Sequence, residues 1–532
     1  MSKKLSLLLV LTLLTSVFTG FSALAAGETT LIVGVPTLLS SLDFEEPTAS
    51  GGQIVAMMRE RGLHYAEQPY PFDAELAAQN VFYPDYSKIE GALIESYEVD
   101  DDAMHAVFHL RKGVTSQWGN EFTSEDVRYT LERAKALNGF QLWLWGIGGM
   151  TGPENITIID DYTYEVNLDA PNGLIALINC HCWSGYIDST ACKEHATEDD
   201  PYATAWVSRN NCGFSPYALV EWVAGEYMLW QAREDWWAGK PSIDTIMIRE
   251  IPESSNRVAM LEAGAIDMAL NLDPEELNYL KGKDGIDVWN IQTGNSTWIF
   301  LDCEDELFDD VLVRQAMLYA MPADEITEDV YKGYGSPMHS MVPATIPGSS
   351  SYWPYTYDLE KAKELLTEAG YPDGFTCEIA YDNSNPMDEA ICVAYQASLA
   401  KIGITANLKS TMLATLTEQK YSKSLQICME TGLPVLPDIN LGCRLYFEPG
   451  GSNNFGKYSN DEVQAMMVKG AEVLDNDERL AFHEEIQKIL VDEVCSIPVC
   501  STNMQIAKRS NVTGKISYDA TNNFFWDKLE KN

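Results

Sequence analysis

The chain has 532 residues, of which 46% are hydrophobic and 22% are charged, which is the composition of a globular protein. That length exceeds the roughly 250–300 residues that one hydrophobic core usually supports, so two or more lobes are expected. The formal net charge of −43 argues against nucleic acid as a partner, because a phosphate-binding surface is basic. Such a negative charge could attract cationic ligands. The simpler interpretation is that it gives the protein a solvated acidic surface, which keeps it soluble.

Residues 1–25 are interpreted as a signal peptide. Two lysines supply its positive end, an apolar run continues to about residue 18, and Ala23-Leu24-Ala25 is a cleavage motif. The apolar run is shorter than the roughly 20 residues of a membrane-spanning helix, and an N-terminal membrane anchor is the alternative. No cysteine precedes Cys180, so no lipidation site is expected at the cleavage point. We therefore expect an exported, soluble protein, periplasmic or extracellular, that is not lipid-anchored.

The stretch from Gly91 to Ala134 predicts a strand, a turn and a helix. The side chains of residues 106–110 alternate in the period-two pattern of a half-buried strand. Thr123 or Ser124 is placed to cap a helix, and Asp126 completes a motif like a capping box. Apolar residues then recur at helical spacing, which gives this helix one buried face.

The same stretch carries three motifs in a fixed order. They read Leu-x-Glu-Ser-Tyr, then Phe-x-Leu-Arg-Lys-Gly-Val, then Trp-Gly-Asn-Glu-Phe-Thr-Ser-Glu-Asp-Val. This order resembles the signature block of family 5 extracellular solute-binding proteins, the dipeptide, oligopeptide and nickel binders of ABC importers. Further blocks follow in the family's order at residues 211–219, 233–241, 261–267, 308–316 and 357–374. The resemblance therefore covers nearly all of the mature chain.

The resemblance implies an α/β fold of the two-lobed periplasmic-binding-protein type (type II), with mixed sheets and a hinge between the lobes. In this interpretation residues 26–55 and 206–292 form lobe I, and an extra domain is inserted at 56–205. Lobe II spans 293–498, and residues 499–532 return to lobe I, with crossings near 206, 293 and 498. The residue pattern itself predicts a strand, a helix and a strand at 375–381, 388–402 and 404–408, an order typical of a mixed sheet flanked by helices.

A cleft between two hinged lobes closes on its ligand. The resemblance places Thr37 and Leu38, which follow the first strand at 30–35, among the ligand-binding residues. It places Gly432 and Leu433 where peptide binders of the family hold a free amine with an acid. Leu433 carries no charge, so this position does not favour a peptide with a free amino end.

Dipeptide binders of the family also hold the ligand's carboxylate with an arginine shortly before an Asn-Pro pair. Before Asn385-Pro386 this chain has Asp382 and Asn383 and no basic residue. A buried ammonium or carboxylate without a counter-charge costs several kcal/mol. A longer or blocked peptide, a cationic ligand or an uncharged solute such as an oligosaccharide therefore fits better than a zwitterionic dipeptide. We expect Trp183 and Trp298 near the cleft, where their rings can stack on such ligands, with burial in the core as the alternative.

The chain has eleven cysteines, an odd number. In an oxidising compartment, disulfides are the leading interpretation for some of them. A zinc site is an alternative near residue 180, although the usual C-x2-4-C spacing is absent, and buried free thiols are another. Two groups lie close in sequence: Cys180, Cys182, Cys192 and Cys212, and then Cys495 and Cys500.

We therefore predict the extracytoplasmic substrate-binding component of an ABC importer, which captures a peptide-like solute and delivers it to the membrane permease. We expect a monomer that is not an enzyme and that uses no cofactor and no metal. The sequence has no Gly-x-Ser-x-Gly, no His-Glu-x-x-His and no phosphate loop, and His483-Glu484-Glu485 lacks the second histidine. The alternatives are a binder of a non-peptide solute, such as an oligosaccharide or a cationic small molecule, and ligand presentation to a sensor.

Overall fold

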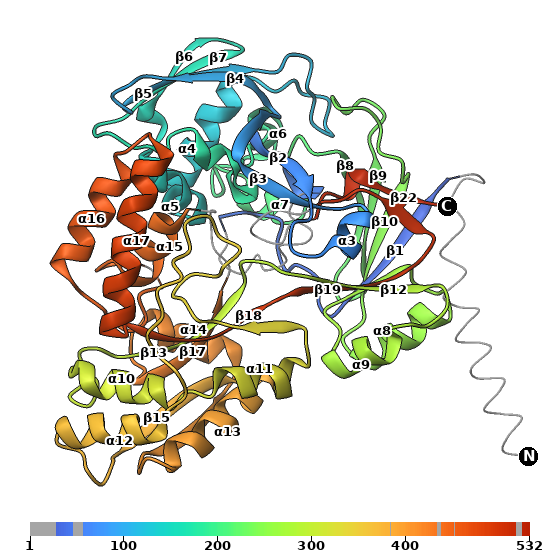
Figure 1. The fold of residues 1–532 in the computed structure, drawn as a ribbon. Helices are drawn as coiled ribbons and strands as arrows, with labels where there is room; N and C mark the ends of the chain where they lie inside the picture. Colours follow the sequence, from blue (N-terminus) through green and yellow to red (C-terminus); the bar gives the residue numbers. More distant parts are fainter. Residues whose placement is uncertain (1–27, 46–56, 384, 433–437, 452, 518–523) are drawn as a thin grey trace, which may run out of the picture.

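The computed structural model describes residues 28–532 except 46–56, 384, 433–437, 452 and 518–523. It does not describe the side chains of Cys182, Pro386, residues 439–441 and Asn476. The molecule has three parts, which we call lobe I, the inserted domain and lobe II, and in Figure 1 these lie at the right, at the top and at the lower left. Within the described residues, no helix combines the length and the apolar character needed to span a bilayer.

Lobe I is built on a seven-stranded sheet with β1 at its centre, parallel to both neighbours. Leu31 and Val33 of β1 enter the main core of this lobe, while Ile32 packs on the opposite face, against the cluster beneath α8 and α9. A central strand covered on both faces is apolar throughout, which explains the run predicted at 30–35. In sheet order the strands are β12 (Ile286–Ile291), β19 (Met504–Arg509), β11 (Met268–Leu270), β1 (Thr30–Val35), β10 (Thr245–Glu250), β9 (Tyr227–Ala232) and β8 (Tyr217–Val223), with helices α8 (Ser254–Glu262) and α9 (Pro274–Leu280).

The inserted domain confirms the predicted strand, turn and helix. Phe108 of β5 stacks on Tyr164 of β7 at 5.0 Å between ring centroids, and the core of this domain forms around them. Thr123 is the N-cap of α4 and forms a capping box with Asp126. The antiparallel sheet has the order β4 (Ile94–Val99), β5 (His105–Leu110), β7 (Thr163–Asn167), β6 (Ile156–Asp160), and the helices are α4 (Ser124–Leu137), α5 (Phe140–Ile147), α6 (Ser189–His195) and α7 (Thr204–Val207), with short 3-10 turns at Pro153–Asn155, Leu177–Cys180 and Cys182–Ser184.

Lobe II confirms the predicted strand, helix and strand, because β15 and β16 pair in parallel with α13 between them in the chain. Its sheet has the order β14 (Gly335–Pro337), β18 (Ser496–Thr502), β13 (Ser296–Leu301), β17 (Ile427–Gly432), β15 (Thr376–Asp382), β16 (Thr405–Thr411). Its helices are α10 (Val311–Tyr319), α11 (Ala323–Tyr331), α12 (Leu359–Glu368), α13 (Pro386–Ala400), α14 (Leu413–Tyr421), α15 (Ile439–Phe447), α16 (Asp461–Ala471) and α17 (Asn476–Glu493).

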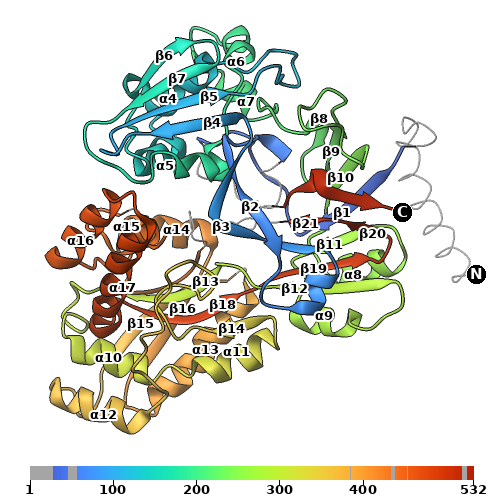
Figure 2. The ribbon, with the colours of Figure 1, turned by 45° about the horizontal axis from the view of Figure 1, so that its top comes forward.

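Two short segments join the sheets of lobes I and II, and they are hydrogen-bonded to each other. The chain leaves lobe I between β12 and β13 and returns between β18 and β19, side by side in Figure 2. Thr293 Oγ1 donates to the carbonyl of Thr502 at 3.0 Å, and Asn295 Nδ2 donates to its hydroxyl at 2.7 Å. A pair of adjacent crossings is the usual construction of a hinge. Residue 206 lies in α7, which packs against the inserted domain, and the predicted domain limits, including the crossing near 206, stay predictions.

The last part of the chain completes lobe I and supports a long hairpin beside the inserted domain. The strand β21 pairs in parallel with β3, so the C-terminal segment holds the hairpin formed by β2 and β3. The elements are β2 (Leu63–Pro69), α3 (Ala74–Ala78), β3 (Val81–Gly91), β20 (Val512–Gly514), β21 (Ile516–Ser517), a 3-10 turn at Trp526–Lys528 and β22 (Leu529–Lys531).

A buried ion pair joins lobe I to the inserted domain. Asp43, which follows β1, accepts hydrogen bonds at 2.8 and 2.5 Å from the guanidinium of Arg133 on α4. The two side chains are 0% and 1% exposed, and Arg133 Nε also donates to the carbonyl of Tyr202 at 3.0 Å. Two charges removed from water in this way depend on each other, because either one alone is an uncompensated buried charge.

We predict that Asp43→Asn lowers the free energy of unfolding by about 3–5 kcal/mol, because it leaves Arg133 charged and unpaired in the interior. Urea denaturation followed by circular dichroism measures the change. The control is Glu360→Gln, which removes an exposed ion pair with Lys363 and should leave stability almost unchanged. Equal stabilities of the two variants would contradict the prediction.

The expectation of disulfides is wrong for the cysteines whose side chains the structure describes. All ten are free thiols, and only Cys303 is not fully buried. They lie in three separate hydrophobic clusters, one in lobe II and two in the inserted domain. Burial raises the pKa of Cys180 to about 12 and that of Cys500 to about 11, so these thiols are protonated. The cysteines are therefore buried as small apolar groups, which was the alternative interpretation.

Candidate functional site

A cavity of about 700 Å³ lies between the inserted domain and lobe II. Such a volume is typical of small-molecule sites. The upper wall comes from the β2–β3 hairpin, β4 and the loop that precedes residue 177. The lower wall comes from the start of α15, from α17 and the segment just before α17, and from the loop between β14 and α12. The lining residues are Tyr65, Gln68, Tyr86, Ser87, Ile89, Tyr97, Val99, Gly173 and Ile175–Leu177 above, and Pro347, Asp438, Leu474, Arg479, Leu480 and His483 below.

Tyrosines form the upper wall of this interlobe cavity. Tyr65 meets Tyr86 edge to face at 5.1 Å between ring centroids, and Tyr83 supports Tyr86 from behind at 5.5 Å. Tyr65 and Tyr97 also pack against the core of the inserted domain, so their rings are held in place. Burial raises the pKa of Tyr65 and of Tyr97 above the ordinary value, so both hydroxyls stay protonated. The wall thus offers ring surface together with hydroxyl groups.

The lower wall contains three titratable residues, Asp438, Arg479 and His483. Arg479 Nε lies 3.0 Å from a carboxylate oxygen of Asp438, and each side chain is 7% exposed. His483 lies one helical turn after Arg479 on α17, so the two side chains share a face. The His483 side chain is completely buried, and its Nε2 is 3.7 Å from Asp438. Burial lowers the pKa of His483 below its ordinary value, so its imidazole is neutral at pH 7.

Direct contacts between the two parts border the cavity. The backbone N–H of Gly173 donates to the carbonyl of Ala471 at 2.6 Å, and the hydroxyl of Tyr83 donates to the carbonyl of Thr345. A second hollow, of about 430 Å³, separates α5 from the end of α15 and is lined by Trp143, Arg444 and Glu448 among others. Residues of the inserted domain and of lobe II thus line two separate hollows.

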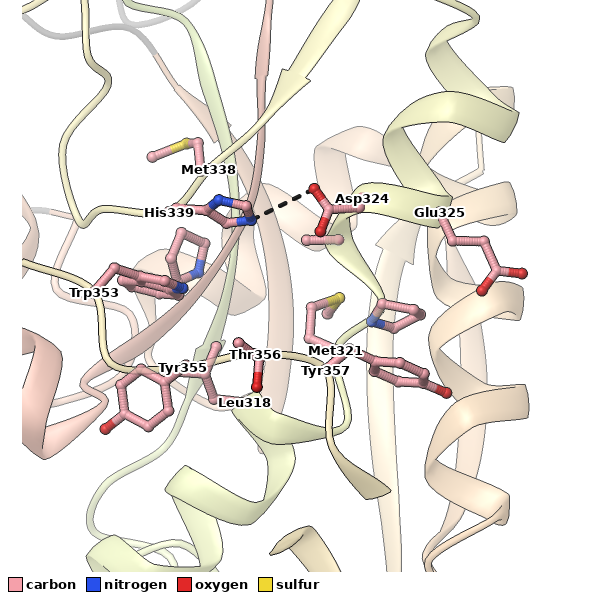
Figure 3. Close-up of a pocket in the computed structure, with 13 residues that line it drawn as sticks. Leu318, Met321, Asp324, Glu325, Met338, His339, Trp353, Tyr355, Thr356 and Tyr357 are labelled. Carbon is pink, nitrogen blue, oxygen red and sulfur yellow. Dashed lines mark ion pairs between the residues drawn. The ribbon is translucent and has the colours of Figure 1, made fainter. Parts of the chain in front are cut away.

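The cavity in Figure 3 is smaller, about 280 Å³, and lies wholly within lobe II. His339 stands between Trp353 and Asp324 there, with Nε2 3.5 Å from the carboxylate. The His339 and Asp324 side chains are 52% and 76% exposed, so this pair contributes little stability. All of its lining residues belong to lobe II, so closure of the lobes does not cover a ligand there. The cavity between the two parts is therefore the better candidate site.

The predicted site residues Thr37, Leu38 and Trp183 lie in lobe I and the inserted domain. Thr37 is exposed just after β1, whereas Leu38 is buried and its N–H donates to Glu250 at 3.0 Å. Trp183 is half-buried between the cores of the two parts, with its ring 4.8 Å from that of Phe44. The ligand-binding role of all three stays a prediction.

Trp298 and Gly432 come together on lobe II. Trp298 is buried on β13, its ring is 5.2 Å from that of Tyr446, and its indole N–H has no hydrogen-bond partner among the described residues. Gly432 ends β17 beside both rings, where any side chain would collide with the Tyr446 hydroxyl. Leu433 lies outside the described residues. The roles of these residues also stay predictions.

Asp382 and Asn383 lie at the end of β15. Asp382 is buried, whereas Asn383 is exposed and its N–H donates to the carbonyl of Thr411 at 3.0 Å. Asp388, in the first turn of α13, lies near Asp382. Burial and the nearby charge of Asp382 raise the pKa of Asp388 to about 7. No described member of the predicted site set lines the interlobe cavity, so the ligand role of Asp382 and Asn383 is likewise still a prediction.

The sequence interpretation missed the residues that do line the cavity. The motif His483-Glu484-Glu485 lacks the second histidine of a metal site, so the sequence gives His483 no role. Tyr97 belongs to the signature motif, which indicates the family and gives this side chain no role of its own. Arg479 and His483 carry a usable signal, since two basic-type side chains at i and i+4 on a helix share a face. Nothing in the sequence indicates that this face lies opposite a wall of tyrosines.

Two hinged lobes with a cavity between them that both parts line define a solute-binding protein. The profile of the bacterial extracellular solute-binding proteins, family 5 Middle, matches residues 88–454, and the chain belongs to this family. This membership confirms the resemblance that the motifs indicated, and the mixed α/β architecture agrees with it.

The chain is similar to binding proteins of several kinds. Glutathione-binding protein GsiB of Salmonella paratyphi A is 25% identical over 525 residues, which cover 94% of each chain. Heme-binding protein A of Haemophilus influenzae is 28% identical over 439 residues, 77% of this chain and 78% of that protein. The periplasmic binding protein DppA of Helicobacter pylori, in complex with peptide STSA, matches 94% of this chain and 98% of its own, with a TM-score of 0.78 and 23% identity. This structural likeness shows the fold alone.

We predict that Gly173→Ala separates the inserted domain from lobe II, because a Cβ at this position would lie 2.2 Å from the carbonyl oxygen of Val473. The measurement is the radius of gyration by small-angle X-ray scattering, which should increase. Gly146→Ala is the control, since a Cβ there meets no atom within 4 Å. An unchanged radius in the Gly173 variant would contradict the prediction.

We predict that Asp388→Asn removes part of the pH dependence of stability. The folded pKa of about 7 lies above the ordinary value of 3.8, so the folded state binds this proton more tightly than the unfolded state. The stabilisation is complete below about pH 4 and is lost as the pH rises through 7. The melting temperature of the variant should therefore fall less between pH 5 and pH 8 than that of the wild type. Glu389→Gln, an exposed neighbour, should retain the wild-type slope.

Proposed function

We propose that this protein is the substrate-binding component of an ABC importer, which captures a peptide-like solute between its lobes and delivers it to the membrane permease. The observation that carries the proposal is the interlobe cavity of about 700 Å³, lined by tyrosines on one side and by Asp438, Arg479 and His483 on the other. A site shared by two hinged parts binds its ligand most tightly when the parts close, and this coupling lets a permease distinguish loaded from empty protein.

The relatives support a peptide-like solute. GsiB is named as a glutathione-binding protein, and glutathione is a peptide. The DppA structure contains the peptide STSA. Heme-binding protein A is named for a large planar ligand, which a wall of aromatic rings also suits. The tyrosine wall is compatible with side chains of a peptide, since aromatic rings contact apolar groups without requiring one sequence.

The export of the protein is part of this proposal. Residues 1–25 act as a cleavable signal peptide, and no cysteine stands at the cleavage point to receive a lipid. The mature protein then works as a soluble monomer outside the cytoplasm and carries out no reaction on its ligand.

Deletion of the gene in its native host, followed by analysis of the medium, tests the transport role. Mass spectrometry of a defined peptide mixture should show at least one peptide that the wild type depletes and the deletion strain leaves behind. Complementation with the intact gene should restore depletion, whereas Gly173→Ala should restore it only in part. Equal depletion of every peptide by the deletion strain would contradict a role in peptide uptake.

A further inference from the structure

His483 is a buried polar residue of the interlobe cavity, and its ring nitrogens lack hydrogen-bond partners among the described residues. Its side chain is completely buried, and neither ring nitrogen has a hydrogen-bond partner in the part of the chain that the structure describes. The nearest charged atom, a carboxylate oxygen of Asp438, lies 3.7 Å from Nε2, which is too far for a hydrogen bond. A buried polar group left in this state costs free energy, and a ligand that supplies the missing partner recovers it.

The charges around His483 cancel. Asp438 and Arg479 form a close pair, and they are the only acid and the only arginine or lysine among the described residues that line the cavity. Because the imidazole is neutral at pH 7, this end of the cavity has hydrogen-bonding groups and no net charge. A carboxylate or an ammonium group placed there would lose its water without gaining a counter-charge. An amide or a hydroxyl group would lose much less and would gain hydrogen bonds.

The opposite wall fits the same kind of ligand. Tyr65, Tyr86 and Tyr97 line the cavity, and the hydroxyls of Tyr65 and Tyr97 are protonated. Ring faces pack well against apolar side chains and against the flat faces of sugar rings. Gln68 adds a neutral amide on the same side. The cavity therefore combines apolar contact with uncharged hydrogen bonding on both of its walls.

We propose that the cavity takes a neutral polar group, an amide or a hydroxyl, attached to an apolar or ring-shaped body, and that binding brings this group against His483, whose ring nitrogens are covered in this structure. The imidazole donates one hydrogen bond to this group and accepts another, while the body packs against the tyrosine wall. Two sources supply this chemistry, a peptide with blocked ends and an oligosaccharide. This inference rests on the proposed function, because it takes the interlobe cavity as the ligand site.

Isothermal titration of the purified mature protein with three probes tests the inference. The probes are the peptide Ser-Thr-Ser-Ala with acetyl and amide ends, the same peptide with free ends, and maltotetraose. The expected result is that the blocked peptide or the sugar binds at least about tenfold more tightly than the free-ended peptide. Tighter binding of the free-ended peptide, or no binding of any probe, would overturn the inference about the ligand.

Variants of His483 test its contact with the ligand. His483→Leu should weaken binding of the preferred probe about tenfold, the effect of one lost hydrogen bond in a buried site. His483→Gln, which keeps a donor and an acceptor, should recover part of the affinity and guards against a simple loss of folding. His109→Leu, on the exposed face of β5, is the matched control and should bind like the wild type. Unchanged binding by His483→Leu would overturn the role of His483, whereas the uptake experiment would still stand as the test of transport.

Discussion

The buried pair between Asp43 and Arg133 determines how the inserted domain is placed on lobe I, and the position of the cavity depends on it. Neither charge can move away from the other without losing its hydrogen-bonded counter-charge, so α4 is held against the segment after β1. The core that contains Val127 and Leu131 of α4 also supports Tyr65 and Tyr97. The orientation of the tyrosine wall is therefore linked, through one helix and one core, to the central strand of lobe I.

The lower wall belongs to lobe II, which two hydrogen-bonded segments of the chain connect to lobe I. Thr293 and Asn295 bind Thr502 across these segments, which keeps the two crossings together. The inserted domain also contacts lobe II directly, where the backbone of Gly173 lies against the backbone of Ala471 and Val473. Only a residue without a side chain allows this approach. The cavity is thus defined by a hinge at one end and a glycine contact at the other, and its volume depends on the angle between the parts.

Two independent lines lead to the same kind of ligand. The resemblance places Leu433 and Asp382 near the positions where dipeptide binders of the family hold charged ends, and neither residue is the acid or the arginine expected there. The cavity has no net charge either, because Asp438 and Arg479 neutralise each other and His483 is uncharged at pH 7. An overall charge of −43 therefore describes the surface of the protein and does not describe this site.

The sequence by itself determined the local elements and the family. The apolar run at 30–35, the capping box at Thr123 and the pattern that became β15, α13 and β16 depend on neighbours within a few residues, and the ordered motifs depend only on the chain. Tertiary structure decided the site and the state of the cysteines. Tyr65 and His483 are about four hundred residues apart, and they line one cavity only because the hinge folds lobe II against the inserted domain. Cysteines that are close in sequence are buried as free thiols, since packing of the cores, and not spacing along the chain, places each side chain.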